Sequence, residues 1–95
     1  MRVARVIGSV VSTVKSEALT GAKLLVVAPL GETPAGEPYV AVDTVGAGRG
    51  EVVLIATGGA ARLALRQPGQ APVDSSIVAI VDRLETEAWL NYVKD

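Results

Sequence analysis

The amino-acid sequence predicts a mainly β protein: a small, partly open barrel of five short strands, with a short helix after the fourth strand and a helix at the C-terminus. Three observations support this fold class. Five runs rich in valine, isoleucine and leucine alternate with segments rich in glycine and proline. The chain has 95 residues, which suits one domain. Its residues are 49% apolar but only 3% aromatic, so the core must be aliphatic, which favours strands.

Each predicted strand is bounded or bent by a residue that disturbs strand pairing. Gly8 lies inside the first strand and predicts a bend or a bulge. Pro29 has no N–H to donate, so pairing of the second strand should end there or continue only at an edge. Residues 31–38 contain two prolines and two glycines, which predicts a hairpin loop. The five strands are predicted at residues 3–13, 23–30, 39–45, 51–57 and 77–82.

Two segments have the composition of helices. Residues 60–66 follow a Gly-Gly step and consist of good helix formers, enough for about two turns. Residues 85–94 carry apolar side chains along one predicted stripe, at Ala88, Trp89, Tyr92 and Val93. Because Trp89 and Tyr92 are two of the three aromatic residues, we expect them to dock the tail on the barrel or on a neighbour. We therefore expect a single domain over residues 1–95, with residues 84–95 as a helical tail.

Charge and composition argue against several classes of protein. The net charge is −1 without a basic run, which disfavours a nucleic-acid or membrane-surface partner. The chain contains neither cysteine nor histidine, so it lacks thiolate ligands and the commonest acid–base residue. We expect no enzyme activity, no cofactor and no metal. The sequence has no convincing signal peptide and no apolar run of about 20 residues, which predicts a cytoplasmic protein.

A glycine-rich loop lies between the third and fourth strands. Gly46, Gly48 and Gly50 fall within five positions, a density expected where the backbone needs positive φ or where another group approaches closely. That group could be a phosphate, a substrate or a second copy of the chain. A dinucleotide loop is disfavoured because the third glycine comes one position early and a strand follows. A Walker A loop would need Lys-Ser or Lys-Thr where Glu51 stands.

Isolated charged residues have simpler structural interpretations. Asp43 directly precedes the glycine loop and Asp74 follows a proline-containing segment, so both are expected to cap turns rather than to form a catalytic carboxylate pair with each other or with Asp82. Arg62 either pairs across a subunit boundary or faces water, and composition alone favours water.

Four segments resemble one known family, in the same order along the chain. They read RVIG followed by VVST from residue 5, LxGxKLL from residue 19, AVDxVGAGxGE from residue 41, and PVDxxIVxIVD from residue 72. This pattern, which covers residues 1–82, resembles the EutN/CcmL family of bacterial microcompartment vertex proteins. One departure lies at residues 59–62, where relatives often carry serines before the Ala-Arg pair and this chain has none.

The resemblance implies an OB-like five-stranded barrel that assembles into a homopentamer. Such pentamers close the vertices of a microcompartment shell in the bacterial cytoplasm, alongside hexameric and trimeric shell proteins. A pentamer is a head-to-tail ring, so each subunit must offer two complementary surfaces. The candidates for the subunit interface or for a loop near the axis are Asp43, Gly46, Ala47, Gly48, Gly50, Glu51 and Arg62.

An OB-like binding module for a small ligand or an oligonucleotide is the alternative function. Such modules commonly stack bases on aromatic side chains beside a basic groove. Before the tail this chain has one aromatic residue, Tyr39, and its charges are balanced.

Overall fold

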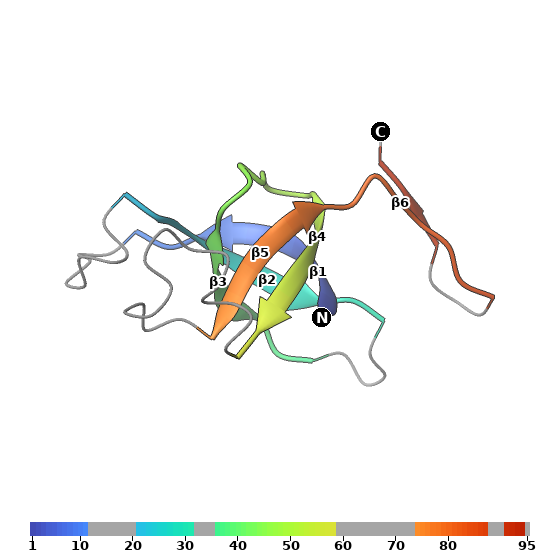
Figure 1. Ribbon diagram of the computed structural model, residues 1–95, viewed down its shortest axis with the longest axis horizontal. Helices are drawn as coiled ribbons and strands as arrows, with labels where there is room; N and C mark the ends of the chain where they lie inside the picture. Colours follow the sequence, from blue (N-terminus) through green and yellow to red (C-terminus); the bar gives the residue numbers. More distant parts are fainter. Residues whose placement is uncertain (12–20, 32–35, 59–73, 88–90, 95) are drawn as a thin grey trace.

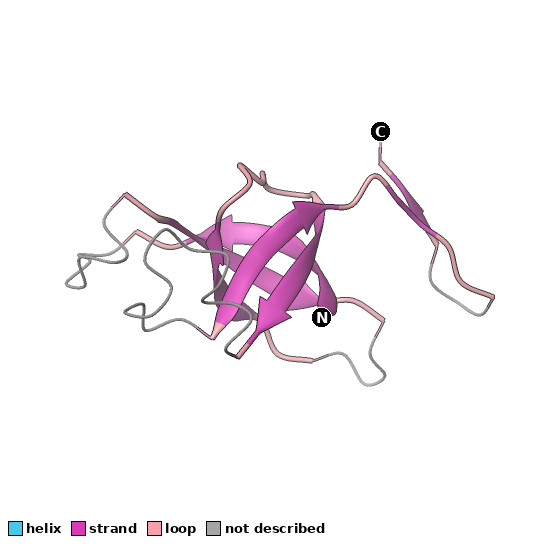
Figure 2. Ribbon diagram, in the orientation of Figure 1, coloured by secondary structure: helices cyan, strands magenta, loops and turns pink. Residues whose placement is uncertain are grey.

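The computed structural model describes residues 1–11, 21–31, 36–58, 74–87 and 91–94. Five strands close into a barrel in the order β1-β2-β3-β5-β4, with β4 paired back to β1 (Figures 1 and 2). The prediction of a five-stranded β-barrel is thus confirmed, but the barrel is closed and the expectation that it is partly open is wrong. Full closure leaves none of these five strands as an open edge. The strands are β1 (Arg2–Ser9), β2 (Lys23–Pro29), β3 (Tyr39–Asp43), β4 (Val52–Thr57) and β5 (Ser75–Ile80).

The first strand makes closure possible because it pairs on both sides. Ala4 and Arg5 face partners in β2 and in β4, and all these pairs are antiparallel. The register with β2 shifts between Val6 and Gly8, which confirms the bulge predicted at this glycine. Between β3 and β5 the pairing is parallel and short, over two residue pairs.

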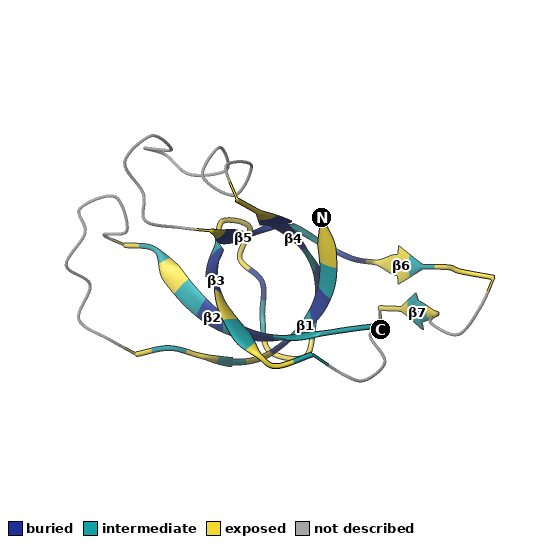
Figure 3. Cartoon of the chain, turned by 90° about the horizontal axis from the view of Figure 1, so that it is seen from below, coloured by how far each residue is buried: buried dark blue, intermediate teal, exposed yellow. Residues whose placement is uncertain are grey.

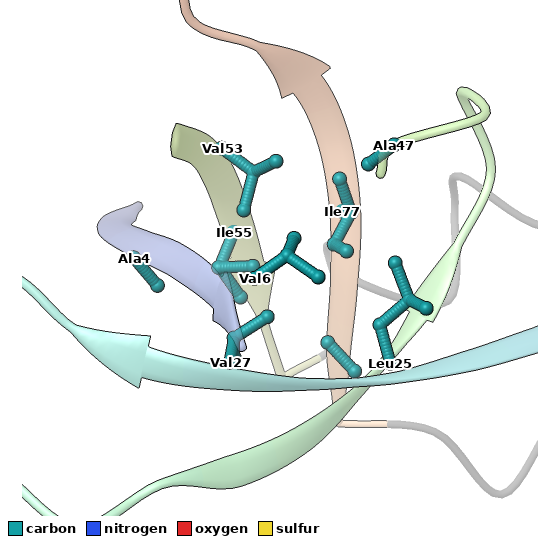
Figure 4. Close-up of a cluster of buried hydrophobic side chains, with 9 residues drawn as sticks. Ala4, Val6, Leu25, Val27, Ala47, Val53, Ile55 and Ile77 are labelled. Atoms are coloured by element: carbon teal, nitrogen blue, oxygen red, sulfur yellow. The ribbon is translucent and has the colours of Figure 1, made fainter. Parts of the chain in front are cut away.

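The core consists of aliphatic side chains that alternate along the strands. Side chains on the inner faces of the strands meet at the barrel centre, and Figure 4 shows those of β1, β2, β4 and β5 converging there. One member, Ala47, comes from the glycine loop and closes one end of the barrel. The buried cluster, each member at most 2% exposed, comprises Ala4, Val6, Leu25, Val27, Ala41, Ala47, Val53, Ile55 and Ile77.

Some strand boundaries differ from the prediction. Strand β3 ends at Asp43 rather than at residue 45, because the Asp43 side chain binds the backbone that follows and turns it. Strand β5 starts at Ser75, two residues before the predicted start, since the polar Ser76 pairs with β3 and with β4. Strand β2 ends at Pro29, as its missing N–H predicts.

The predicted C-terminal helix over residues 85–94 is wrong in the part that the structure describes. The chain forms a two-stranded antiparallel sheet from β6 (Arg83–Leu84) and β7 (Tyr92–Val93), beside the barrel in Figure 1. Aromatic and β-branched residues favour strands, and the amide of Lys94 donates to the carbonyl of Asp82 at 2.7 Å. The Asn91 side chain also accepts from the amide of Thr86. The helix predicted at residues 60–66 lies outside the described residues.

Among the described residues, no helix is long and apolar enough to cross a membrane.

Candidate functional site

The glycine loop between β3 and β4 is held by the side chain at its start. The Asp43 carboxylate accepts from the amide of Val45 at 3.1 Å with Oδ1 and from the amide of Ala47 at 3.0 Å with Oδ2. This confirms the turn cap predicted at Asp43. The Thr44 hydroxyl donates to the carbonyl of Ile77 at 2.7 Å, which fastens the loop to β5. The loop is therefore a fixed part of the barrel end.

The three glycines of this loop show the two features predicted for them, positive φ and close approach of another group. Gly46 has φ of 78° and Gly50 has φ of 90°, in the region that favours glycine. At Gly48 the need is space, because an added Cβ would lie 3.3 Å from Oε1 of Glu51. Within the single subunit, the group that approaches Gly48 is thus a carboxylate of the same chain.

Replacing Gly50 with alanine is expected to lower the free energy of unfolding by about 1–2 kcal/mol, the cost of placing an L residue at positive φ. Nothing lies within 4 Å of the added Cβ, so backbone strain is the whole effect. Gly8→Ala is the control, since its Cβ would meet only the Val26 side chain at 4.0 Å without positive φ. Equal losses in urea unfolding of the two variants would contradict this explanation.

Glu51 joins the glycine loop to the C-terminal sheet. Its Oε1 accepts from the amide of Gly48, and its Oε2 lies 2.7 Å from Nζ of Lys94. The hydrogen bond from Lys94, followed by that from the Gly48 amide, lowers the pKa of Glu51 below its ordinary value of 4.5. The same ion pair raises the pKa of Lys94 above 10.5.

Arg5 makes the second connection between the loop and the tail. Its guanidinium donates to the carbonyl of Gly50 at 2.7 Å and lies 5.6 Å from the centre of the Tyr92 ring. Tyr92, a predicted docking residue, therefore lies against β1 of its own chain. Trp89, the other one, is outside the described residues.

We expect docking of the C-terminal sheet to depend on pH. Glu51 has a depressed pKa when folded, so its contribution is complete above 4.5 and is lost as the pH falls through the lowered value. Lys94 has a raised pKa, so its contribution is complete below 10.5 and is lost as the pH rises through the raised value. The amide NMR signal of Lys94 should move as the pH falls through the lowered Glu51 pKa, and the side-chain Hε signal of Lys94 should move as the pH rises through its own raised pKa.

Glu51→Gln is the matched variant for this titration, because it keeps the side-chain shape and removes the charge. Its Lys94 amide signal at neutral pH should already resemble the acidic wild-type signal. An unchanged Lys94 signal in Glu51→Gln would contradict a role for the ion pair in docking the tail.

The outer face of the barrel carries two separate apolar patches. Figure 3 shows the ring of strands with buried and more exposed residues alternating along them. The β4 patch consists of cross-strand partners on three adjacent strands, which are Val3, Leu54 and Ala79. The β2–β3 patch is formed by Leu24, Val26 and Val40. Leu54 is half-buried and Val40 is 46% exposed in the single subunit, so both patches can lose further surface on assembly.

The structure brings together most of the residues predicted from the sequence as a site, but not all. Asp43, Gly46, Ala47, Gly48, Gly50 and Glu51 form the glycine loop, while Arg62 lies outside the described residues. Sequence reasoning missed Arg5 and Lys94, which hold the loop and the tail together across long sequence separations. In the described part of the chain, no group of acidic side chains could hold a metal ion.

Comparison with known proteins identifies the family. Residues 1–82 match the family described as Ethanolamine utilisation protein EutN/carboxysome. The chain belongs to the EutN/CcmL family. This confirms the resemblance predicted from the four sequence segments.

Individual EutN/CcmL relatives match over nearly the whole chain. The chain is 49% identical over 88 residues to the bacterial microcompartment shell vertex protein GrpN of Rhodospirillum rubrum, covering 90% of this chain and 98% of GrpN. It is 45% identical over 96 residues to the carboxysome shell vertex protein CcmL of Thermosynechococcus vestitus, covering 99% and 96%. The solved GrpN pentameric microcompartment shell protein from R. rubrum superposes with a TM-score of 0.77 at 49% identity, covering 90% and 100%. EutN/CcmL proteins are structural shell proteins and not enzymes.

Proposed function

We propose that this chain forms a homopentamer that caps the vertices of a bacterial microcompartment shell in the cytoplasm. The observation that carries the proposal is the match to GrpN, a pentameric shell protein, at 49% identity over 90% of this chain. The names of the vertex proteins GrpN and CcmL support the same place in a shell. In this function the chain has a structural role: it shapes the shell vertex and catalyses no reaction.

The two outer patches support a ring. A closed ring joins one surface of each subunit to a different surface of the next, whereas a two-fold dimer uses the same surface twice. The β4 patch and the β2–β3 patch lie on different strands of the barrel and are both aliphatic. They supply the two unlike surfaces that a head-to-tail contact requires.

The glycine loop is proposed to lie near the five-fold axis or a subunit seam. Its small residues would allow backbones to approach closely. We propose the same location for Arg62. We also expect residues 1–95 to act as one domain, with the tail docked on its own barrel through Tyr92 and Lys94. Hexameric and trimeric shell proteins are the proposed partners. The interface candidates in the loop are Asp43, Gly46, Ala47, Gly48, Gly50 and Glu51.

Native mass spectrometry of the purified chain tests the proposal. We expect the mass of five subunits, unchanged by single-stranded DNA, since an OB-like nucleic-acid module would gain the mass of the oligonucleotide. A chain that stays monomeric at all concentrations would overturn the proposal. A complex with the oligonucleotide would instead favour the binding module.

A further inference from the structure

A small hollow lies at the barrel end where β1 finishes and β2 begins. Its volume is about 190 Å³. The floor is formed by two core side chains, Val6 and Leu25, which are 1% and 2% exposed. Gly8 and Ser9 of β1, Lys23 of β2 and Arg49 of the glycine loop complete the lining. The hollow therefore combines an apolar floor with a rim that carries two positive charges and a hydroxyl.

The two cations on this rim are not neutralised by any carboxylate in the described residues. Lys23 has only a long hydrogen bond to the carbonyl of Ala47, at 3.4 Å, and no ion pair or hydrogen bond is found for Arg49 in the described part of the chain. The other described cations are engaged elsewhere: Arg2 on the Tyr39 ring, Arg5 on Gly50 and Tyr92, Arg83 with Glu85, and Lys94 with Glu51.

The nearby carboxylates are already occupied. Asp43 is the cross-strand partner of Lys23, but its two oxygens accept from the amides of Val45 and Ala47. Glu51, two residues after Arg49, binds Gly48 and Lys94. Among the described residues, no carboxylate would thus have to be displaced from these two cations by an incoming anion.

We propose that this hollow binds a small monocarboxylate anion with a short alkyl chain. The carboxylate would accept from the Lys23 ammonium and from the Arg49 guanidinium, whose fork matches a carboxylate in two parallel hydrogen bonds. The alkyl chain would lie over the small part of Val6 and Leu25 that the hollow exposes. A volume of about 190 Å³ is below that of sites for drug-sized ligands, so the hollow suits a small anion. All the lining residues come from one barrel, although Arg49 belongs to the glycine loop that is proposed to lie near a subunit seam.

The apolar floor distinguishes this ligand class from inorganic anions. Sulfate and phosphate are strongly hydrated on all sides, so burying one face against Val6 and Leu25 would leave oxygen atoms without hydrogen bonds. A monocarboxylate has one charged end, which would lie at the cationic rim, and one apolar end, which would lie at the floor.

Propionate is the probe, followed through the methyl NMR signals of Val6 and Leu25 at constant ionic strength. We expect saturable shifts with propionate. Propionamide has the same shape without the charge and should bind at least about tenfold more weakly, the loss that one charge-assisted hydrogen bond represents. Sulfate should leave the two methyl signals in place. Equal shifts with propionamide, saturable shifts with sulfate, or no shift with propionate would each overturn the proposal.

Charge-neutral variants locate the site. Lys23→Gln and Arg49→Gln should each weaken propionate binding by about tenfold. Arg83→Gln is the matched control, because it removes a cation that is paired with Glu85 on the C-terminal sheet, and it should bind as wild type does. Wild-type affinity in Arg49→Gln would overturn the proposal. The oligomeric mass of each variant, measured in parallel, separates this result from the test of the pentamer.

Discussion

Replacing Leu54 with glutamate is expected to convert the pentamer into folded monomers. Leu54 lies at the centre of the β4 patch, with Val3 and Ala79 as its cross-strand partners. Its side chain points away from the core, since its neighbours Val53 and Ile55 point inward. The single barrel should therefore tolerate the charge. In a ring the same carboxylate would be buried against apolar side chains without a partner, at a cost of several kcal/mol for each subunit.

Native mass spectrometry and the circular dichroism spectrum together measure this outcome. The mass should fall to that of one subunit while the β-sheet spectrum is kept. Val93→Glu provides the control, because it makes the same kind of change at a side chain that is 69% exposed and lies outside both patches. A Leu54→Glu protein that remains pentameric would remove the β4 patch from the interface.

Mixing two monomeric variants tests whether the contact is head-to-tail. Val40→Glu disrupts the β2–β3 patch but keeps the β4 patch, and Leu54→Glu does the reverse. An equimolar mixture should form a dimer, because one intact patch of each kind remains and the ring cannot close. If each patch instead paired with the same patch of another subunit, each single variant would already form a dimer through its intact patch. Absence of the mixed dimer at high concentration would argue against pairing of these two patches.

Sequence reasoning succeeded where a local cause fixes the structure. Gly8 bulges and Pro29 ends a strand because each changes the hydrogen bonds that its own backbone can make. Asp43 caps a turn because its carboxylate reaches amides two and four residues away. The positive φ of Gly46 and Gly50 has the same local origin. Each of these features can be predicted from a few consecutive residues of the sequence.

The tail was predicted wrongly because distant contacts decide it. A stripe of apolar residues over 85–94 fits a helix locally, but Lys94 binds Glu51 and Tyr92 lies on Arg5. Those partners are more than forty residues away along the chain, beyond any periodicity. The burial of Ala47 in the core and the gathering of Lys23 and Arg49 around one hollow have the same cause. Each depends on barrel closure, which no local pattern specifies.

The largest loss of stability is expected from shortening a side chain at the barrel centre. Ile77 is fully buried in β5 and pairs with Ile55 across β4. Ile77→Ala should lower the free energy of unfolding by about 2–5 kcal/mol, because the closed barrel cannot collapse to fill the cavity. The loss would be a large share of the roughly 5–15 kcal/mol typical of a folded domain.

Urea unfolding should be measured in the Leu54→Glu background, so that dissociation of subunits does not add to the free energy. Ile77→Val, which removes one methyl group, is expected to cost about 0.5–1.5 kcal/mol and gives the graded control. Val78→Ala should cost less than Ile77→Ala, because Val78 is only half-buried where the β4–β5 register shifts. If Ile77→Ala cost no more than Val78→Ala, the barrel interior would be loose enough to repack, and the aliphatic cluster could not be what fixes its shape.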